Sequence, residues 1–334
     1  MSNLIKRIQS SYKLNKIKLR IDDFGFNKRF TIDETIAVIG SARSGTTWIM
    51  ELLLNLPCYV SVFEPFHPRW FPESSELGFS PKPCIIDHEC ERKLEEYLMR
   101  AFTGKLRSRI PKYDFTLGEV ASRLRAERLV VKFVRANMIL PLIINKFNLR
   151  LALFVVRHPY AVIASQLKTG YTGFTNIVGD DYMPTTRELL PYLRALGYDS
   201  ELINYVSTLE NGVETLAANW AIENCLPLTL VEPTDLYMVV YEEMYNNPGD
   251  CLKRLLHRMN EGEHYNKILS KIEKPSLSTR IDDIEEVKDR ANIVNQWKKQ
   301  LSVRDTQKIS SVLNMFGIEV DDTNYKIGSI MEYP

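Results

Sequence analysis

The stretch TIAVIGSARSGTTW, residues 35–48, decides the fold of this chain. Its apolar run 36–39 is typical of a short buried strand, and apolar residues recur at helical spacing from Thr46 until Pro57 ends the helix. A loop bounded by two glycines joins the strand to the helix. This order directs several backbone N–H groups, and the positive end of the helix dipole, toward one point. The stretch therefore predicts an anion-binding site.

The loop suits a metal-free anion better than ATP with Mg²⁺. Two glycines with four residues between them resemble a nucleoside-triphosphate loop, yet Thr46 stands where that loop has its lysine, and Arg43 supplies the charge. No aspartate ends the apolar runs at Val134 or Val156, so no carboxylate is evident that would hold the metal. The residues predicted to surround the anion are Ser41, Ala42, Arg43, Ser44, Gly45, Thr46 and Thr47. Trp48 is either a packing residue or a stacking partner for a base.

Three further apolar runs predict strands of the same sheet, at 129–134, 151–156 and 236–241. Helices are expected over 160–168, opened by Pro159, and over 248–259. Continuous apolar strands that alternate with helices predict the α/β class, as a P-loop-like three-layer fold with a central parallel sheet flanked by helices. Ligands of such sheets bind beyond the carboxyl ends of the strands, so the strand-end motifs are expected to open onto one side.

The chain is predicted to hold one domain over 35–320. An extension, 1–34, precedes it, and a tail, 321–334, follows it. The turn-rich, aromatic stretch 169–211 is interpreted as an insertion over the sheet, on the acceptor side. The basic start of the chain reads as a solvated helix or a frayed terminus, with an amphipathic helix on a membrane surface as the alternative.

Composition excludes several classes of protein. A net charge of +1 over 334 residues argues against a general nucleic-acid binder. No apolar run approaches the roughly 18 residues that a membrane-spanning helix needs. Five cysteines at scattered spacings favour free thiols in a reducing compartment, so we expect a cytoplasmic protein. The run 87–90 with nearby Cys84 lacks a second group of ligands, and no metal site is expected there.

A second motif, RHPYAVIAS at 157–165, points to a second anion. Arg157 ends a predicted strand, and Ser165 lies two turns into the next helix. This spacing could clamp a phosphate with one charge-assisted hydrogen bond and one hydroxyl hydrogen bond. A donor with a 5′ anionic chain and a further 3′-phosphate would use both motifs.

The chain resembles the sulfotransferases that use 3′-phosphoadenosine-5′-phosphosulfate (PAPS). GSARSGTTW resembles the 5′-phosphosulfate loop of that family, and VVRHPYAVIAS resembles its 3′-phosphate motif. VFEPF (62–66) is similar to a glutamate–proline segment of Golgi carbohydrate sulfotransferases and their bacterial relatives. VVYEEMYNNP (239–248) and NQWKKQL (295–301) resemble later motifs of the family. Arg43 departs from the lysine of cytosolic animal enzymes and matches bacterial and Golgi-type members.

The resemblance implies a PAPS-dependent O-sulfotransferase that releases adenosine 3′,5′-bisphosphate (PAP) and uses no metal. Arg157 and Ser165 would bind the 3′-phosphate, and the segment with Trp297 and Lys298 would close over the nucleotide. Arg43 is expected to stabilise the charge of the transition state. The chain also needs a general base for the acceptor hydroxyl. Glu64 is the first candidate for this role, and His67 is its rival.

Lys132 lies in an otherwise apolar strand and is assigned to the active site, because a buried charge needs a partner. The acceptor is expected to be a small-molecule or saccharide hydroxyl. The sequence between residues 100 and 135 contains ten basic and three acidic residues. This excess of positive charge favours either a solvated surface or a patch that steers an anionic acceptor or the donor. A nucleotide or small-molecule kinase and a non-catalytic nucleotide-binding protein remain the alternatives.

Overall fold

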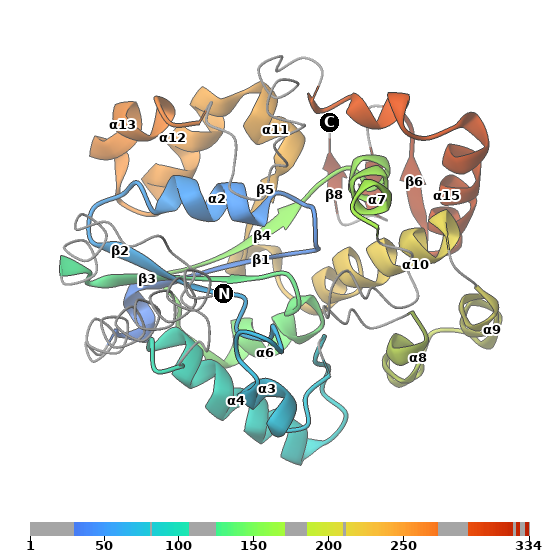
Figure 1. The fold of residues 1–334 in the computed structure, drawn as a ribbon, viewed down its shortest axis with the longest axis horizontal. Helices are drawn as coiled ribbons and strands as arrows, with labels where there is room; N and C mark the ends of the chain where they lie inside the picture. Colours follow the sequence, from blue (N-terminus) through green and yellow to red (C-terminus); the bar gives the residue numbers. More distant parts are fainter. Residues whose placement is uncertain are drawn as a thin grey trace, which may run out of the picture.

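The computed structural model contains a five-stranded parallel sheet with helices on both faces (Figure 1). It describes residues 30–80, 82–106, 125–170, 186–209, 212–272, 293–322, 325–327 and 331–333. The strand order is β2-β3-β1-β4-β5, and every neighbouring pair is parallel. The predicted α/β fold with a central parallel sheet is therefore confirmed. The strands are β1 (Thr35–Gly40), β2 (Tyr59–Phe63), β3 (Arg128–Phe133), β4 (Leu151–Val156) and β5 (Tyr237–Val240).

All four predicted strands form, with ends that differ by no more than one residue. The fifth strand, β2, was not predicted, and its five residues include the polar Ser61. This strand lies at the edge of the sheet, where it pairs with β3 so that Phe63 is opposite Lys132. Because all five strands are parallel, their carboxyl ends meet at one edge. The strand-end motifs consequently lie on the same side of the sheet, as predicted.

One face of the sheet is covered by the helix that follows the anion loop and by two helices from the later part of the chain. Figure 1 shows α2 (Thr46–Leu53), α12 (Pro248–Arg258) and α13 (Tyr265–Leu269) on this face. The side chains of Ile36, Val38, Leu153 and Val155 pack into this core. Burial of this strand face holds α2, and with it the loop, in a fixed position against β1.

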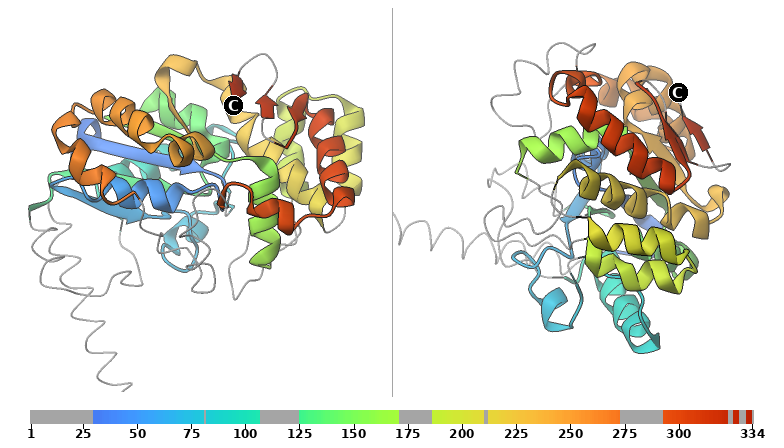
Figure 2. Two further views of the ribbon diagram at one scale, coloured as in Figure 1. Left: turned by 90° about the horizontal axis from the view of Figure 1, so that it is seen from above. Right: turned by 90° about the vertical axis from the view of Figure 1, so that its right-hand side faces the viewer.

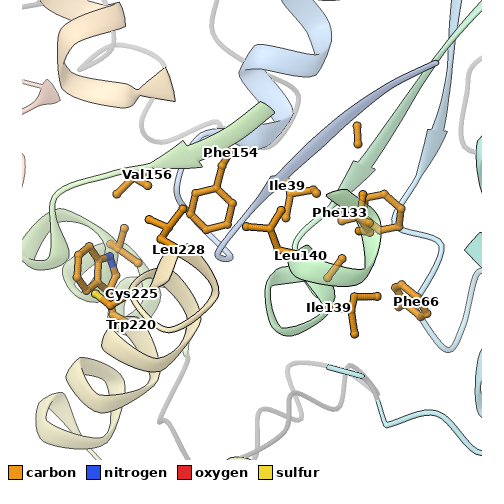
Figure 3. Close-up of a cluster of buried hydrophobic side chains, with 14 of the residues drawn as sticks. Ile39, Phe66, Phe133, Ile139, Leu140, Phe154, Val156, Trp220, Cys225 and Leu228 are labelled. Atoms are coloured by element: carbon orange, nitrogen blue, oxygen red, sulfur yellow. The ribbon is translucent and has the colours of Figure 1, made fainter. Parts of the chain in front are cut away.

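The opposite face carries the larger core, part of which Figure 3 shows. Ile39, Phe133 and Phe154 project from three neighbouring strands toward α6 (Leu140–Lys146) and α10 (Val213–Asn224). The helices α4 (His88–Phe102) and α15 (Val303–Met315) complete this layer. Side chains of one strand alternate between the two faces, which explains why the strands are apolar throughout.

Part of the predicted insertion is helical. Residues 186–208 contain α8 (Thr186–Ala195) and α9 (Ser200–Thr208), two helices that were not predicted, while the assignment of 169–211 as an acceptor-side insertion stays a prediction. Leu193 and Val206 of these helices pack with Ile222 of α10 in a separate small core. Figure 1 accordingly shows α8 and α9 beyond α10, away from the sheet. Residues 171–185 of the predicted insertion lie outside the described residues.

The end of the chain adds a small antiparallel sheet of β6 (Ile318–Val320), β7 (Tyr325–Ile327) and β8 (Met331–Tyr333). Tyr325, in the predicted tail, is buried, and its ring meets the edge of Trp220 with centroids 5.7 Å apart. The tail thus packs on the helical layer. In both views of Figure 2, α7 (Pro159–Lys168), α10 and α15 lie near one another at this end of the molecule.

Short elements complete the described chain: η1 (Ile32–Glu34), α3 (Glu73–Glu76), η2 (Asn137–Ile139), η3 (Pro227–Leu230), η4 (Pro233–Asp235), α11 (Tyr241–Asn246), η5 (Gly262–His264) and η8 (Gln296–Lys299). The run 87–90 begins α4, where the Asp87 carboxylate accepts a hydrogen bond from the Cys90 N–H at 2.7 Å. Within the described ranges, no helix is long and apolar enough to cross a membrane, and no group of three possible metal ligands occurs.

Candidate active site

The loop after β1 is a tight turn that both of its glycines make possible. Gly45 has φ = 97°, and a Cβ added to it would lie 2.4 Å from the Tyr241 ring. A Cβ on Gly40 would lie 2.5 Å from the Val155 carbonyl oxygen. Arg43 also adopts a left-handed conformation, with φ = 74°. A side chain is therefore excluded where the backbone turns most sharply, and Arg43 is held at the top of the turn.

The predicted loop residues divide into those held by the protein and those turned outward. The buried ones are Ser41, Ala42, Ser44 and Thr46. The Ser41 hydroxyl accepts a hydrogen bond from the Asn224 amide at 2.8 Å, and the Ala42 carbonyl accepts one from the Gln166 amide at 3.1 Å. Arg43, Gly45 and Thr47 alternate with the buried residues and are partly exposed. These three residues are the ones that can meet a ligand through their side chains or backbone.

The second motif lies directly beside the loop. Arg157 follows β4, and Ser165 lies on α7, the helix that Pro159 opens. The Arg43 Nε donates to the Ser165 hydroxyl at 2.9 Å, and the Arg157 Nη1 donates to the Arg43 carbonyl at 3.2 Å. The structure therefore brings together three predicted anion-binding side chains from two distant parts of the sequence.

The carboxyl end of β5 supplies two residues that the sequence analysis did not single out. The Tyr241 ring lies under the Arg157 guanidinium, 4.4 Å from its carbon, and Glu242 Oε1 lies 4.0 Å from Arg157 Nε. The same oxygen of Glu242 accepts a hydrogen bond from the His158 N–H at 3.0 Å. Burial raises the pKa of Glu242, although Arg157 and this hydrogen bond oppose the effect. Tyr241 and Glu242 could have been found from the sequence, because they come directly after an apolar strand of the sheet.

Glu64 follows β2 in a left-handed conformation, with φ = 54°, and is buried. Its carboxylate accepts hydrogen bonds from Lys132, from the Val134 N–H at 3.1 Å and from Arg135 at 3.4 Å. Burial acts to raise the pKa of Glu64, but Lys132 and Arg135 outweigh it, and the net shift is downward. The anion that partners Lys132 within the protein is therefore this carboxylate.

Lys132 links Glu64 to the loop. Burial lowers the pKa of Lys132, and the positive charges of Arg135 and Arg43 act in the same direction, while Glu64 opposes them. The ammonium group also lies over the Phe63 ring, 4.3 Å from its centroid. Lys132, at the end of β3, and Arg43, in the loop after β1, therefore lie on the same edge of the sheet.

His67 lies one turn beyond Glu64, because its N–H donates to the Glu64 carbonyl at 2.9 Å. The imidazole is buried and stacks on the Trp70 ring, with centroids 3.8 Å apart and an angle of 16°. Its Nδ1 accepts from the Arg69 N–H at 3.3 Å. The two candidate bases therefore belong to one turn.

The tryptophans of the predicted site are packed against this edge. Trp48 meets Tyr241 edge-on at 5.5 Å, and Trp297 stacks on His158 at 5.7 Å. Lys298 lies 3.3 Å from an Asp322 carboxylate oxygen, so in this structure it faces the end of the chain. The segment around Trp297 thus packs against His158 and Tyr160, at the start of α7.

Four of the described basic residues in the run 100–135 are paired with carboxylates. Arg100 pairs with Glu73, Arg128 with Glu34 and Glu261, and Lys132 and Arg135 with Glu64. Residues 107–124, which include Arg107 and Arg109, lie outside the described residues. These four paired cations do not form a separate exposed patch.

No family model and no curated protein match the chain. Its structure is similar to solved structures of sulfotransferases. The sulfotransferase domain of the Synechococcus PCC 7002 olefin synthase is 15% identical, with 88% of this chain and 100% of that chain covered and a TM-score of 0.45. Mouse sulfotransferase SULT7A1 complexed with PAP is 12% identical, with 86% of this chain and 85% of that chain covered and a TM-score of 0.39. The likeness concerns the fold, and residue roles rest on the contacts described above.

Proposed function

We propose that this protein is a sulfotransferase that moves a sulfuryl group from PAPS to the hydroxyl of a carbohydrate, glycolipid or other alcohol. The observation that carries the proposal is the junction of the two anion motifs, in which Arg43 bonds Ser165 and Arg157 bonds the backbone of the loop. A donor with one anionic group on its 5′ chain and another at its 3′ position would contact both motifs. In this proposal residues 35–320 form the catalytic domain.

The donor supplies an activated sulfuryl group and a leaving phosphate. The backbone N–H groups of the loop and the Thr47 hydroxyl bind its 5′ anionic chain, and Arg157 with Ser165 binds its 3′-phosphate. Arg43 and Lys132 stabilise the negative charge that develops during transfer. This division of roles is supported by the partial exposure of Arg43 and Thr47 and by the influence of Arg43 on Lys132.

Glu64 accepts the proton of the acceptor hydroxyl, with His67 as the second candidate. Its ionised carboxylate shares the Lys132 ammonium group. When the negative charge of the donor attracts that ammonium group, one oxygen of Glu64 loses a partner and gains proton affinity. Lys132 would thus couple donor binding to the proton affinity of the base.

Five free thiols support a reducing compartment, and we propose the cytoplasm.

A kinase on this fold would need a carboxylate for Mg²⁺. Glu64 and Glu242, which follow β2 and β5, already accept hydrogen bonds from this chain. This arrangement favours the sulfotransferase over a kinase. Thermal shifts with PAP and with ADP·Mg²⁺ separate the two activities, because only the matching ligand should stabilise the protein. Stabilisation by ADP·Mg²⁺ and not by PAP would overturn the proposal.

Turnover is measured with labelled PAPS and a panel of sugars, glycolipids and simple alcohols. Label should pass to at least one hydroxyl acceptor with the wild type and about 100- to 1000-fold less efficiently with Arg43→Ala. Arg92→Ala is the matched control, since Arg92 is an exposed arginine of α4 that pairs with Glu96. Binding of PAP without transfer to any acceptor would favour the non-catalytic alternative.

A further inference from the structure

The buried carboxyl group of Glu242 has no role in the chemistry proposed above, yet it lies directly behind Arg157. Its side chain is only 8% exposed. Oε1 accepts the His158 N–H at 3.0 Å and lies 4.0 Å from Arg157 Nε. Oε2 and Arg157 Nε are both buried, and neither has a hydrogen-bond partner among the residues that the structure describes. A buried carboxyl group with such incomplete partners lowers the stability of the fold. Its presence here therefore calls for another purpose.

The contacts of Glu242 fix the junction between β4 and α7. His158 is the N-cap residue of α7, and its own ring accepts from the Tyr160 N–H at 3.3 Å. The hydrogen bond from His158 to Glu242 therefore holds the point where the chain leaves the sheet and enters the helix that carries Ser165. Arg157, the residue before His158, is placed by the same junction.

The Arg157 guanidinium is also held on its other sides. Tyr241, the neighbour of Glu242, presents its ring to the guanidinium at 4.4 Å, and the Arg43 carbonyl accepts from Nη1 at 3.2 Å. Two strand ends and the anion loop thus orient one cation. An arginine fixed before its ligand arrives loses less side-chain entropy on binding than a mobile one.

We infer that Glu242 is a positioning residue that makes the Arg157–Ser165 pair selective for a nucleotide with a 3′-phosphate. The inference rests on the proposed function, because it assumes that this pair receives the 3′-phosphate of the donor. Glu242 acts through the His158 N–H and through Arg157, and it does not touch the nucleotide. Its effect should therefore appear in the contribution of the 3′-phosphate and not in binding of the 5′ group.

The test compares the affinities of PAP and AMP, which differ by the 3′-phosphate alone, in calorimetric titrations of the whole chain. In the wild type, PAP should bind more tightly than AMP by about tenfold or more, the value of a charge-assisted contact. Glu242→Asp moves the carboxylate away from the His158 N–H and should remove most of this ratio. Glu242→Gln keeps an acceptor for that N–H and should retain the ratio within about threefold. AMP affinity should change little in either variant.

Glu243→Gln is the matched control, because Glu243 lies on the same helix but pairs with Arg254 at the surface. A role in stability alone would lower Tm in the Asp variant and leave the ratio of affinities unchanged, which would overturn the inference. If Glu242→Asp does not fold, Glu242→Ala takes its place, and an unchanged ratio of affinities in that variant would overturn the inference. Failure of the wild type to bind PAP would instead count against the proposed function.

Discussion

The two edges of the central sheet use the same types of charged residue in different proportions. At the amino ends of the strands, Glu34 and Glu261 pair with Arg128 and Arg150, with N–O distances of 2.7 to 3.2 Å in three of the four contacts. Two carboxylates therefore balance two arginines. At the carboxyl ends, the described residues include four cations, Arg43, Lys132, Arg135 and Arg157, and two carboxylates, Glu64 and Glu242.

This difference separates a structural edge from a candidate functional edge. The balanced network ties residues before β1 and β4 to β3 and to the segment after α12. The excess of positive charge at the other edge lies beside a loop whose backbone is arranged to bind an anion. Substitutions at the two edges should consequently affect different properties, stability at the first and catalysis at the second.

The largest effect is expected from Arg43→Ala. Removing a cation from the place where transition-state charge develops should lower kcat/KM by about 100- to 1000-fold. The fold should be retained, because arginine and alanine both carry a Cβ and are similarly strained at φ = 74°. Arg43 is also partly exposed, so its removal leaves little buried space. Steady-state kinetics and a thermal melt of the same preparation check both parts. A large loss of Tm would place Arg43 with the structural edge.

Glu261→Ala should produce the opposite pattern. It leaves Arg128 and Arg150 short of a partner, and breaking a buried ion pair costs about 3 kcal/mol of unfolding free energy. The kcat of the folded fraction should stay within about twofold, since the site lies at the far edge. Urea unfolding and kinetics measure the two quantities. Glu263→Ala, which removes an exposed partner of His264 alone, is the control and should leave stability unchanged.

Most of the sheet could be predicted from the sequence, because buried parallel strands are apolar throughout. Lys132 was recognisable as a buried cation in such a strand, but its partner Glu64 follows β2, and only the pairing of β2 with β3 places them together. Glu242 was missed for a similar reason. One glutamate after an apolar strand is common, and its significance depends on Arg157 of the neighbouring strand.

The helices α8 and α9 were harder to predict than the sheet. Pro191 lies inside α8, and Gly197 and Tyr198 follow it, so the local sequence favours turns. Packing of Leu193 and Val206 against Ile222 of α10 overrides this preference. Contacts between distant parts of the chain determine both the helical structure of α8 and α9 and the ion-pair partners in the candidate site. No single segment of the sequence reveals such contacts.

A smaller effect is expected from Glu64→Gln, which tests how the functional edge handles protons. Loss of a general base should lower kcat by about 100-fold while donor affinity stays within about threefold. Lys132 and Arg135 keep the pKa of Glu64 low, so Glu64 should be ionised, and able to accept a proton, throughout the neutral pH range. Pre-steady-state transfer of label measures the chemical step. A near-normal rate would transfer the role of base to His67, and Glu76→Gln is the surface control.

The smallest effect is a contrast in pH dependence between the two carboxylates of the functional edge. The pKa of Glu64 lies below its ordinary value of 4.5 in the folded chain, so its contribution to stability is present above that value and is lost as pH falls through the native pKa. The pKa of Glu242 lies above 4.5, mainly because of burial, so the native state binds its proton more tightly than the unfolded state does. Stability due to Glu242 should therefore decrease as pH rises from 4.5 through its native pKa. Urea unfolding from about pH 3 to about pH 7 measures wild type minus Glu64→Gln and wild type minus Glu242→Gln, and the first difference should rise with pH while the second falls. Differences that change in the same direction would show that the pKa values of the two carboxyl groups are not shifted in opposite directions.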